Sequence, residues 1–391
     1  MRWLADRSSR GSLVATSLLA MILAGCSTKE PIEEPAPVPD ISSTVELESV
    51  WTMDVGNGHG DQFLYLTPLN TGEVIYAAAA NGDVYAVQAE NGKVDWYQDL
   101  DEQIFAGVGG DREQLYLVTR DAKLLGLSRN DGEVLWETAL PNEVLATPQS
   151  NGNVVVVQTI DGKVLAFATA TGELTWQYDG VVPVLSIRAA APPLVGTELV
   201  LAGFTNGKLM ALSAETGQPL WQYEVGEPQG RTELERLVDI TSQPLILESA
   251  ALVVGYQGKL ALVDLRNGDE IWSRAASSLH SPMIGAGNIY VSSANGDIIA
   301  YRGADRRELW TQDRLSWRQT TQPVVYDDYL LVGDFEGYIH MMALEDGSLQ
   351  GQLEFDDDGL RVPAQRLRNG NLLVFGNSGK LSVLELREND D

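Results

Sequence analysis

One short pattern recurs along most of the chain and constrains its fold more than any other feature. A turn glycine preceded by a polar residue occurs at seven positions, and Ala122 fills an eighth, equivalent position. The glycines are Gly82, Gly162, Gly207, Gly258, Gly296, Gly337 and Gly379. Self-similarity at a period of about 40 residues is typical of solenoids and propellers, in which one small structural unit is repeated.

Tryptophans follow the turn positions at a fixed distance. In six of the first seven units a tryptophan stands fourteen residues after the turn position, and Gly351 is the exception. These residues are Trp96, Trp136, Trp176, Trp221, Trp272 and Trp310. A second glycine precedes the tryptophan position by four residues, except where Arg306 stands. We therefore expect each tryptophan to have the same structural role, packed between neighbouring units.

Each unit contains four short runs that are rich in Val, Leu and aromatic residues. In the third unit they cover residues 146–149, 154–157, 163–167 and 174–178, and Asp161-Gly162 between the middle two is a hairpin-turn dipeptide. No segment shows a long helical period. Units of four strands and about 40 residues predict an all-β chain that folds as a β-propeller with four-stranded blades.

The two ends of the repeat set the number of blades. Gly379 would need its tryptophan beyond the last residue, whereas Trp51 has no turn glycine upstream. The economical solution is that an N-terminal strand over residues 45–51 completes the last blade. Such closure leaves no open sheet edge in the ring. The sequence therefore predicts an eight-bladed propeller over residues 44–388, with its last blade closed by the N-terminal strand.

The first 25 residues are typical of an export signal. Three arginines precede an apolar run over residues 13–24, which is too short for a membrane-spanning helix. The run ends in Leu23-Ala24-Gly25-Cys26, which resembles the bacterial lipobox. This resemblance implies cleavage before Cys26 and lipidation of its sulfur. Cys26 is the only cysteine of the chain, so we expect neither an intrachain disulfide nor a catalytic thiol.

The residues after Cys26 predict an anchor to the outer membrane. Ser27 follows the cysteine, and by resemblance to enterobacterial sorting this implies the outer membrane, with the protein facing the periplasm. Several acyl chains would hold it there firmly. Residues 26–43 carry four prolines among acidic residues. We expect the lipidated cysteine to be followed by a stiff, solvated tether with nothing to pack against.

The charge of the chain limits its partners. The 391 residues carry a formal net charge of −28 at pH 7, and removal of residues 1–25 leaves 24 basic and 54 acidic side chains. Such a body repels the phosphates of nucleic acids and the head groups of anionic lipids. We therefore expect no nucleic-acid partner, and contact with the membrane only through the N-terminal lipid.

Candidate chemistry is sparse. His59, His280 and His340 fall in different units without ligand spacing, which argues against a zinc site and a Ser-His-Asp triad. Residues 356–359, Asp-Asp-Asp-Gly, lack the alternating ligands of a calcium loop and predict a solvated link between blades. Residues 107–110 precede a strand and not a helix, so they do not fit a phosphate loop. We expect no catalytic, cofactor or metal site.

The links between blades differ in length, and the differences predict a binding surface. A proline stands fourteen residues before six of the turn positions and marks the start of those units. Most links from a tryptophan position to the next proline position span 10–13 residues, but those from Trp176 to Pro193 and from Trp221 to Pro244 span 17 and 23. The closing link after Trp51 also spans 17. All emerge on one face, where insertions often mark the binding surface. The first two combine aliphatic residues with Arg, as an interface core requires; the alternative is that they fold onto the rim.

The repeats resemble those of a known family. Residues 85–96, Tyr-Ala-Val-Gln-Ala-Glu-Asn-Gly-Lys-Val-Asp-Trp, and residues 210–221 resemble the units of pyrroloquinoline-quinone-type propellers. A lipobox, a Pro-rich tether and eight such units in fewer than 400 residues resemble the BamB family. These are scaffold lipoproteins of the outer-membrane β-barrel assembly machinery. The resemblance implies a non-catalytic scaffold that docks on BamA and helps nascent outer-membrane proteins to assemble.

The same resemblance assigns site residues. The two long links match the motifs by which the family docks on BamA, and the match covers Leu185, Ile187, Arg188 and Asp239. The family has a second acid two residues after the first, where this chain has Thr241. Two other functions stay open: a quinone-dependent dehydrogenase, disfavoured because the two adjacent cysteines of those enzymes are missing, and an adaptor for another periplasmic complex. A nascent strand could also add to an exposed blade edge.

Overall fold

The structure, a computed structural model, describes residues 33–183, 185–187 and 191–388. Residues 35–391 form a compact unit distinct from residues 1–34. The export signal and Cys26 lie outside the described residues. Within the described ranges the regular elements are 32 β-strands, and no helix there is long and apolar enough to cross a membrane.

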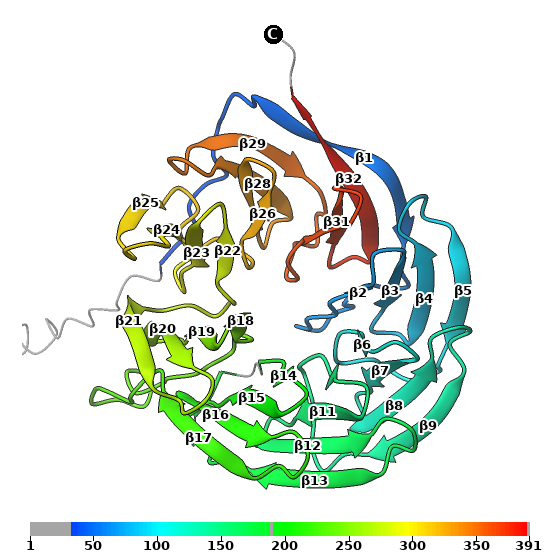
Figure 1. Ribbon diagram of the computed structural model, residues 1–391. Coiled ribbons are helices and arrows are strands. Elements are labelled where there is room, and N and C mark those ends of the chain that lie inside the picture. The colour runs from blue at the N-terminus through cyan, green and yellow to red at the C-terminus, as the bar shows by residue number, and fades with distance from the viewer. Residues whose placement is uncertain (1–32, 184, 188–190, 389–391) are drawn as a thin grey trace, which may run out of the picture. The chain divides into compact units, whose positions relative to one another are not determined.

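Eight antiparallel, four-stranded sheets form a ring, which confirms the predicted eight-bladed β-propeller (Figure 1). Blades 1 to 4 consist, from the inside outward, of β2 (Leu69–Asn70), β3 (Val74–Ala78), β4 (Asp83–Gln88) and β5 (Val94–Asp99); β6 (Gly109–Gly110), β7 (Gln114–Val118), β8 (Lys123–Ser128) and β9 (Val134–Ala139); β10 (Gln149–Ser150), β11 (Val154–Gln158), β12 (Lys163–Ala168) and β13 (Leu174–Asp179); and β14 (Leu194–Val195), β15 (Leu199–Gly203), β16 (Lys208–Ser213) and β17 (Pro219–Glu224). Blades 5 to 7 consist of β18 (Leu245–Leu247), β19 (Ala250–Val254), β20 (Gly258–Asp264) and β21 (Glu270–Ala276); β22 (Met283–Gly285), β23 (Asn288–Ser292), β24 (Ile298–Arg302) and β25 (Glu308–Gln312); and β26 (Val324–Tyr326), β27 (Tyr329–Gly333), β28 (Tyr338–Ala343) and β29 (Leu349–Glu354).

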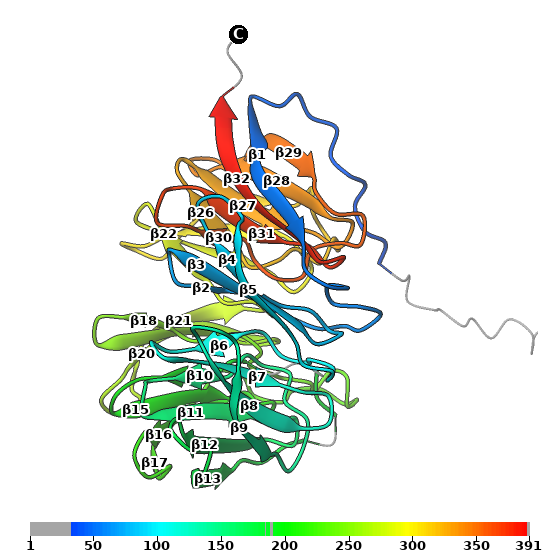
Figure 2. The same cartoon turned by 90° about the vertical axis from the view of Figure 1, so that its right-hand side faces the viewer.

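Blade 8 joins the two ends of the chain. Its strands are β30 (Gln365–Arg366), β31 (Leu372–Phe375), β32 (Lys380–Glu388) and, outermost, β1 (Val45–Asp54). β1 pairs antiparallel with β32 from Val45 opposite Glu388 to Asp54 opposite Lys380, with an irregularity between Ser49 and Trp51. The predicted closure by the N-terminal strand is therefore confirmed, and Figure 2 shows β1 and β32 side by side.

Tryptophan–glycine contacts join one blade to the next. The ring of Trp136 in blade 2 lies against Gly172 of blade 3, where an added Cβ would come within 2.4 Å of the ring. The indole Nε1–H of Trp136 also donates to the carbonyl oxygen of Thr169, at 2.9 Å. The same pair of contacts recurs for Trp51, Trp96, Trp176, Trp221 and Trp310. In these units the glycine four residues before the tryptophan position has no room for a side chain, because the indole of the preceding blade covers it.

The two breaks in the repeat have physical explanations. Arg306 replaces the glycine that would face Trp272, and its guanidinium lies over the Trp272 ring with 5.5 Å between the charged carbon and the ring centroid. Arg306 adopts a φ of 61°, so the backbone keeps the left-handed turn of the glycines. Gly351 replaces a tryptophan at the place where β29 lies next to the first residue of β1. A Cβ there would lie 2.4 Å from the carbonyl oxygen of Val45, so no larger residue fits.

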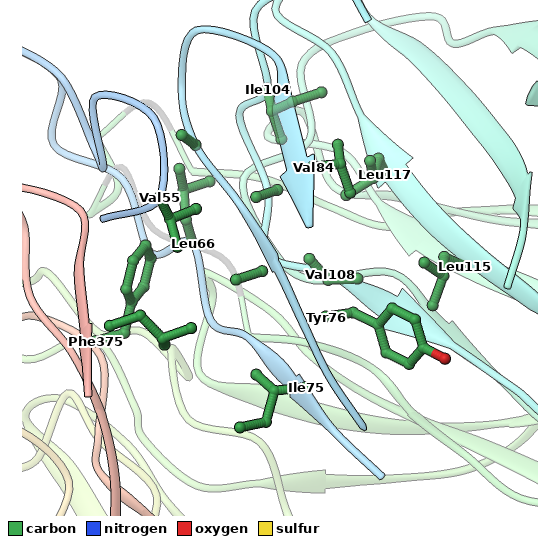
Figure 3. Packing of buried hydrophobic residues seen from close by; sticks show 14 of the residues in the cluster. Val55, Leu66, Ile75, Tyr76, Val84, Ile104, Val108, Leu115, Leu117 and Phe375 are labelled. Carbon is green, nitrogen blue, oxygen red and sulfur yellow. The ribbon is translucent and has the colours of Figure 1, made fainter. Parts of the chain in front are cut away.

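The core consists of apolar side chains on the inner strands of neighbouring blades. Figure 3 shows Phe375 of blade 8, Ile75 and Tyr76 of blade 1 and Leu115 of blade 2 within a single buried cluster. The middle strands β3 and β7 are buried almost throughout, whereas the outermost strands β5 and β9 are largely exposed. Burial of the inner strands therefore holds the ring together and leaves the links free to carry a binding surface.

The segment before β1 differs from the solvated tether that the sequence predicts. Pro39 is buried, and the backbone N–H of Ala36 donates to the carbonyl oxygen of Ser316 at 2.9 Å. At the other end, Thr44 donates from its backbone N–H and from Oγ1 to the carbonyl oxygen and Oε1 of Gln350, at 2.7 and 2.8 Å. Composition alone shows that a Pro-rich segment is stiff, but not that the propeller binds it. We call residues 35–44 the strap.

Candidate partner-docking face

Two long links flank blade 4 on one face of the propeller. The link from β13 to β14 covers residues 180–193, and the link from β17 to β18 covers residues 225–244. Each runs from the outermost strand of one blade to the innermost strand of the next. All links of this kind emerge on the same face, together with the turns between the two middle strands of each blade. We call this side the link face.

Both long links place apolar side chains in solvent. Leu185 is 40% exposed and Val181 74% exposed on the first link, and Leu234 is 72% exposed on the second. A short turn presents Leu234: Glu235 accepts hydrogen bonds from the backbone N–H groups of Arg231 and Thr232 at 2.6 and 3.1 Å. Exposed aliphatic side chains on an acidic body are what a partner surface requires.

Asp239 connects the two links from the inside. Its carboxyl group is buried at 1% exposure and accepts hydrogen bonds from the backbone N–H groups of Ile187 and Ile240. Burial raises the pKa of Asp239 to about 7, against the opposing effect of these two donors. Its backbone pairs with Tyr256 of blade 5 as an isolated bridge. Asp239 is therefore a positioning residue that holds Ile187, and not an exposed contact at the rim of an interface.

A cavity of about 110 Å³ lies between the links. Ser186, Ile187, Asp239 and Ile240 line it together with the turns of blades 3 and 4. Three buried oxygen atoms in or beside it, Asp239 Oδ2, Gln158 Oε1 and Thr205 Oγ1, make no hydrogen bond with the part of the chain that the structure describes.

The position of the family's second acid faces elsewhere. The Oγ1 hydroxyl of Thr241 donates to the carbonyl oxygen of Leu279, at 2.8 Å, in the link between blades 5 and 6. A carboxylate cannot make this bond, because it has no proton to donate. Thr241 thus joins two neighbouring links, and Asp239 is the acid that faces the cavity.

The structure places three of the four predicted docking residues. It brings Ile187 and Asp239 into contact, although 52 positions separate them, and it exposes Leu185 beside them. Arg188, the fourth, lies outside the described residues, as does the lipidation site Cys26. The role of these residues in docking stays a prediction.

The other candidate groups are used within the fold. Asp356 is buried: its carboxylate accepts hydrogen bonds from the backbone N–H groups of Asp358 and Ser378, at 3.1 Å each. The expectation of a solvated link holds for Asp357 and is wrong for Asp356, because that side chain fixes the adjacent turn of blade 8. Gly109 and Gly110 form β6, packed against Pro148 of the next blade. Among the described residues no group of His, Cys, Asp and Glu could hold a metal.

One buried charged cluster has no counterpart in the repeat. Arg318, in the link from β25 to β26, is 1% exposed; its Nε–H donates to Asp334 Oδ2 at 2.7 Å and its Nη2–H to Glu336 Oε2 at 2.6 Å. His340 Nε2 lies 2.8 Å from the same Asp334 oxygen. Burial alone would raise the pKa of Asp334, but hydrogen bonds from His340 and Arg318 outweigh it and lower the pKa. The sequence shows these residues only as scattered polar positions.

Comparison with known proteins identifies the family. The family described as "Outer membrane protein assembly factor BamB" matches residues 80–312. A protein of that name from Marinobacter adhaerens is 68% identical over 381 residues, which cover 97% of each chain. The protein of that name from Pseudomonas aeruginosa is 45% identical over 94% of this chain and 97% of its own.

The chain belongs to the BamB family.

A solved BamB structure agrees with this membership, and a solved structure of another protein shares only the fold. The crystal structure of BamB from Moraxella catarrhalis is similar with a TM-score of 0.79 and 27% identity, over 87% of this chain and all of the other. A quinohemoprotein alcohol dehydrogenase from Comamonas testosteroni has a TM-score of 0.69 at 11% identity, over 88% of this chain and 78% of the other. The second likeness shows only that the fold is shared.

Proposed function

We propose that this chain is a lipid-anchored scaffold of outer-membrane β-barrel assembly, which docks on BamA through the two long links on its link face. The observation that supports the docking site is the exposed side chain of Leu185 next to Ile187, whose backbone N–H the buried carboxyl group of Asp239 holds. A rigid frame lowers the entropy that an interface loop loses on binding. The names of the BamB relatives support the assembly role.

Docking would combine an apolar contact with a charged one. Leu185 supplies exposed apolar area, and Arg188 is the basic residue adjacent to Ile187 in an otherwise acidic chain. A guanidinium at an interface orients the partner through charge-assisted hydrogen bonds to a carboxylate. Asp239 acts through Ile187, since the carboxyl group itself is covered.

Strand addition at a blade edge is a second mode for nascent proteins. The outermost strands carry exposed aliphatic residues one or two positions before the tryptophan, among them Leu135 of β9, Leu174 of β13 and Leu220 of β17, each more than half exposed. An unpaired edge with exposed apolar side chains can accept a further strand. This mode places the client on the rim of the propeller and BamA on the link face.

Purification of the assembled complex tests the proposal. We expect the full-length tagged chain, extracted from outer membranes in mild detergent, to retain BamA, and the Cys26→Ala variant to leave the membrane fraction after a salt wash. Recovery of a different complex without BamA would support the adaptor alternative. Turnover of an alcohol after addition of pyrroloquinoline quinone and calcium would support the dehydrogenase alternative.

A further inference from the structure

The strap completes the hydrogen bonding of the buried Arg318 guanidinium. Nε and Nη2 of Arg318 bind the carboxylates of Asp334 and Glu336, and Nη1 donates to the carbonyl oxygen of Ala36 at 2.8 Å. A buried cation with an unused donor is costly, since the donor has lost its water without replacement. The carbonyl group of Ala36 therefore supplies the third acceptor for the Arg318 guanidinium.

The sequence of the strap suits this site. In Pro35-Ala36-Pro37 only Ala36 has a backbone N–H, and both its N–H and its carbonyl group bind the link between β25 and β26. The prolines restrict the free chain to extended conformations, so docking costs less conformational entropy than it would for a flexible linker. Further contacts come from buried Pro39 and from the carbonyl group of Asp40, which accepts a hydrogen bond from Arg314 at 3.2 Å.

The strap runs from the start of β1, crosses β29 near Gln350 and reaches the link between blades 6 and 7 at Ser316 (Figures 1 and 2). That link runs from an outermost strand to an innermost one, so it belongs to the link face. The end of the strap at Ala36 consequently lies on the link face, which also carries Leu185 and Asp239.

We infer that the strap is a built-in positioning device: it fixes the point where the anchored N-terminus leaves the propeller and keeps the link face close to the membrane. The inference rests on the proposed lipid anchor at Cys26. With the strap docked, only residues 27–34 separate the lipid from the propeller, which is a reach of about 27 Å. Without it, residues 27–44 are free and the reach grows to about 60 Å. The strap thus limits the distance from the membrane surface at which the propeller can bind a membrane-embedded partner.

A pair of matched substitutions separates docking of the strap from folding of the propeller. Pro39→Asp puts a charge at a buried strap position, whereas Pro37→Asp puts the same charge at an exposed one two residues away. Arg318 itself is unsuitable, because its loss would leave the buried carboxylate of Asp334 without its cation. All variants must keep the melting temperature of the parent propeller to within about 3 °C.

The first measurement needs no lipid. The chain from Ser27 onward has no cysteine, so nitroxide labels can be placed at Asp40→Cys and at the exposed Asp131→Cys of blade 2. Pulsed electron spin resonance should give one narrow distance distribution for the parent and for Pro37→Asp, and a distribution several times broader for Pro39→Asp. A broad distribution in the parent, or no broadening in Pro39→Asp, would overturn the docked strap.

The second measurement tests the consequence. The full-length lipidated chain, labelled with a donor dye at Leu234→Cys and reconstituted in phosphatidylethanolamine–phosphatidylglycerol vesicles that contain acceptor lipids, should show at least about a twofold lower transfer efficiency when Pro39→Asp is present. Equal efficiencies, with the first measurement positive, would show that the strap docks but does not set the height. Absence of every variant from the vesicles would contradict the lipid anchor, and with it the positioning role, while the docked strap would stand on the first measurement.

Discussion

Asp239 accepts a hydrogen bond from the backbone N–H of Ile187, and this contact joins the two long links on either side of blade 4. The carboxyl group is 1% exposed, so the acid and the exposed Leu185 have different roles. Leu185 offers surface to a partner, and Asp239 keeps that surface in place. Removal of Asp239 should therefore disturb docking by loosening a link and not by deleting a contact.

The raised pKa of Asp239 predicts a pH dependence of stability. The folded pKa of about 7 lies above the ordinary value of 3.8, so the unfolded chain releases this proton at lower pH. The contribution of Asp239 to the free energy of unfolding is therefore greatest below pH 4 and falls as the pH rises to 7, by up to about 4 kcal/mol. Asp239→Asn keeps an oxygen for Ile187 but cannot ionise. Urea unfolding at several pH values should show a flatter profile for the variant between pH 4 and 7, and parallel profiles would contradict the assignment.

His59 predicts the opposite slope at acid pH. Burial, together with the charge of Arg361, lowers the pKa of His59 to about 4, and the ring is packed edge-on against Phe375. The unfolded chain takes up this proton near pH 6.5, so the free energy of unfolding should fall by about 3 kcal/mol between pH 6.5 and 4. His59→Gln should reduce the loss over this range in urea unfolding. If the free energy of unfolding falls by the same amount between pH 6.5 and 4 in the variant, His59 does not cause this loss of stability.

Closure of the ring predicts a large effect of Trp51. Its indole donates to the carbonyl oxygen of Ala89 at 3.0 Å and covers Gly92 of blade 1. Trp51→Ala should lower the free energy of unfolding by roughly 3–5 kcal/mol, because it removes the packing between the last blade and the first. Val50→Ala, at the exposed neighbouring position of β1, is the control and should change it by less than about 1 kcal/mol. Equal, small effects of the two substitutions in denaturant unfolding would mean that closure by β1 does not stabilise the ring.

Replacement of a glycine that a tryptophan covers should cost more stability than replacement of an uncovered glycine. Gly172 has a φ of 69° and its added Cβ would lie 2.4 Å from the Trp136 ring, whereas Gly152 has a φ of 91° and no atom within 4 Å of that position. Gly152→Ala therefore reports the cost of the backbone conformation alone, about 1–3 kcal/mol. Gly172→Ala adds displacement of the indole and should cost at least about 2 kcal/mol more. Thermal unfolding of the two variants makes the comparison, and similar values would refute the packing role.

The repeat predicts the ring, but not what is added to it. The spacing of glycine and tryptophan depends on contacts between adjacent blades, such as Trp136 on Gly172. This contact recurs at six of the eight blade junctions, and the regular spacing of the units yields the blade number. The closure at Trp51 followed from the same spacing. Arg306 also obeys it, since the guanidinium over Trp272 replaces the usual glycine.

The site was only partly accessible to sequence reasoning, because burial is not a local property. Link lengths indicated the face, and the family resemblance indicated the residues. Neither could show that Asp239 is covered while Leu185 is exposed, since this depends on the cavity between blades 3 and 4. The docking of Ala36 on Arg318 joins residues 282 positions apart. A Pro-rich, acidic composition predicts a tether and gives no sign of such a contact.

Affinity for purified BamA tests the central claim most directly. The folded mature chain should bind BamA. Leu185→Ala and Arg188→Ala should each raise the dissociation constant at least about tenfold. Leu174→Ala is the matched control: it removes the same side chain from a more exposed position, on β13 and away from the link face. We predict that its affinity equals that of the parent, with melting temperatures unchanged in all three variants. Parental affinity for both link variants, or a loss confined to Leu174→Ala, would contradict docking through the link face.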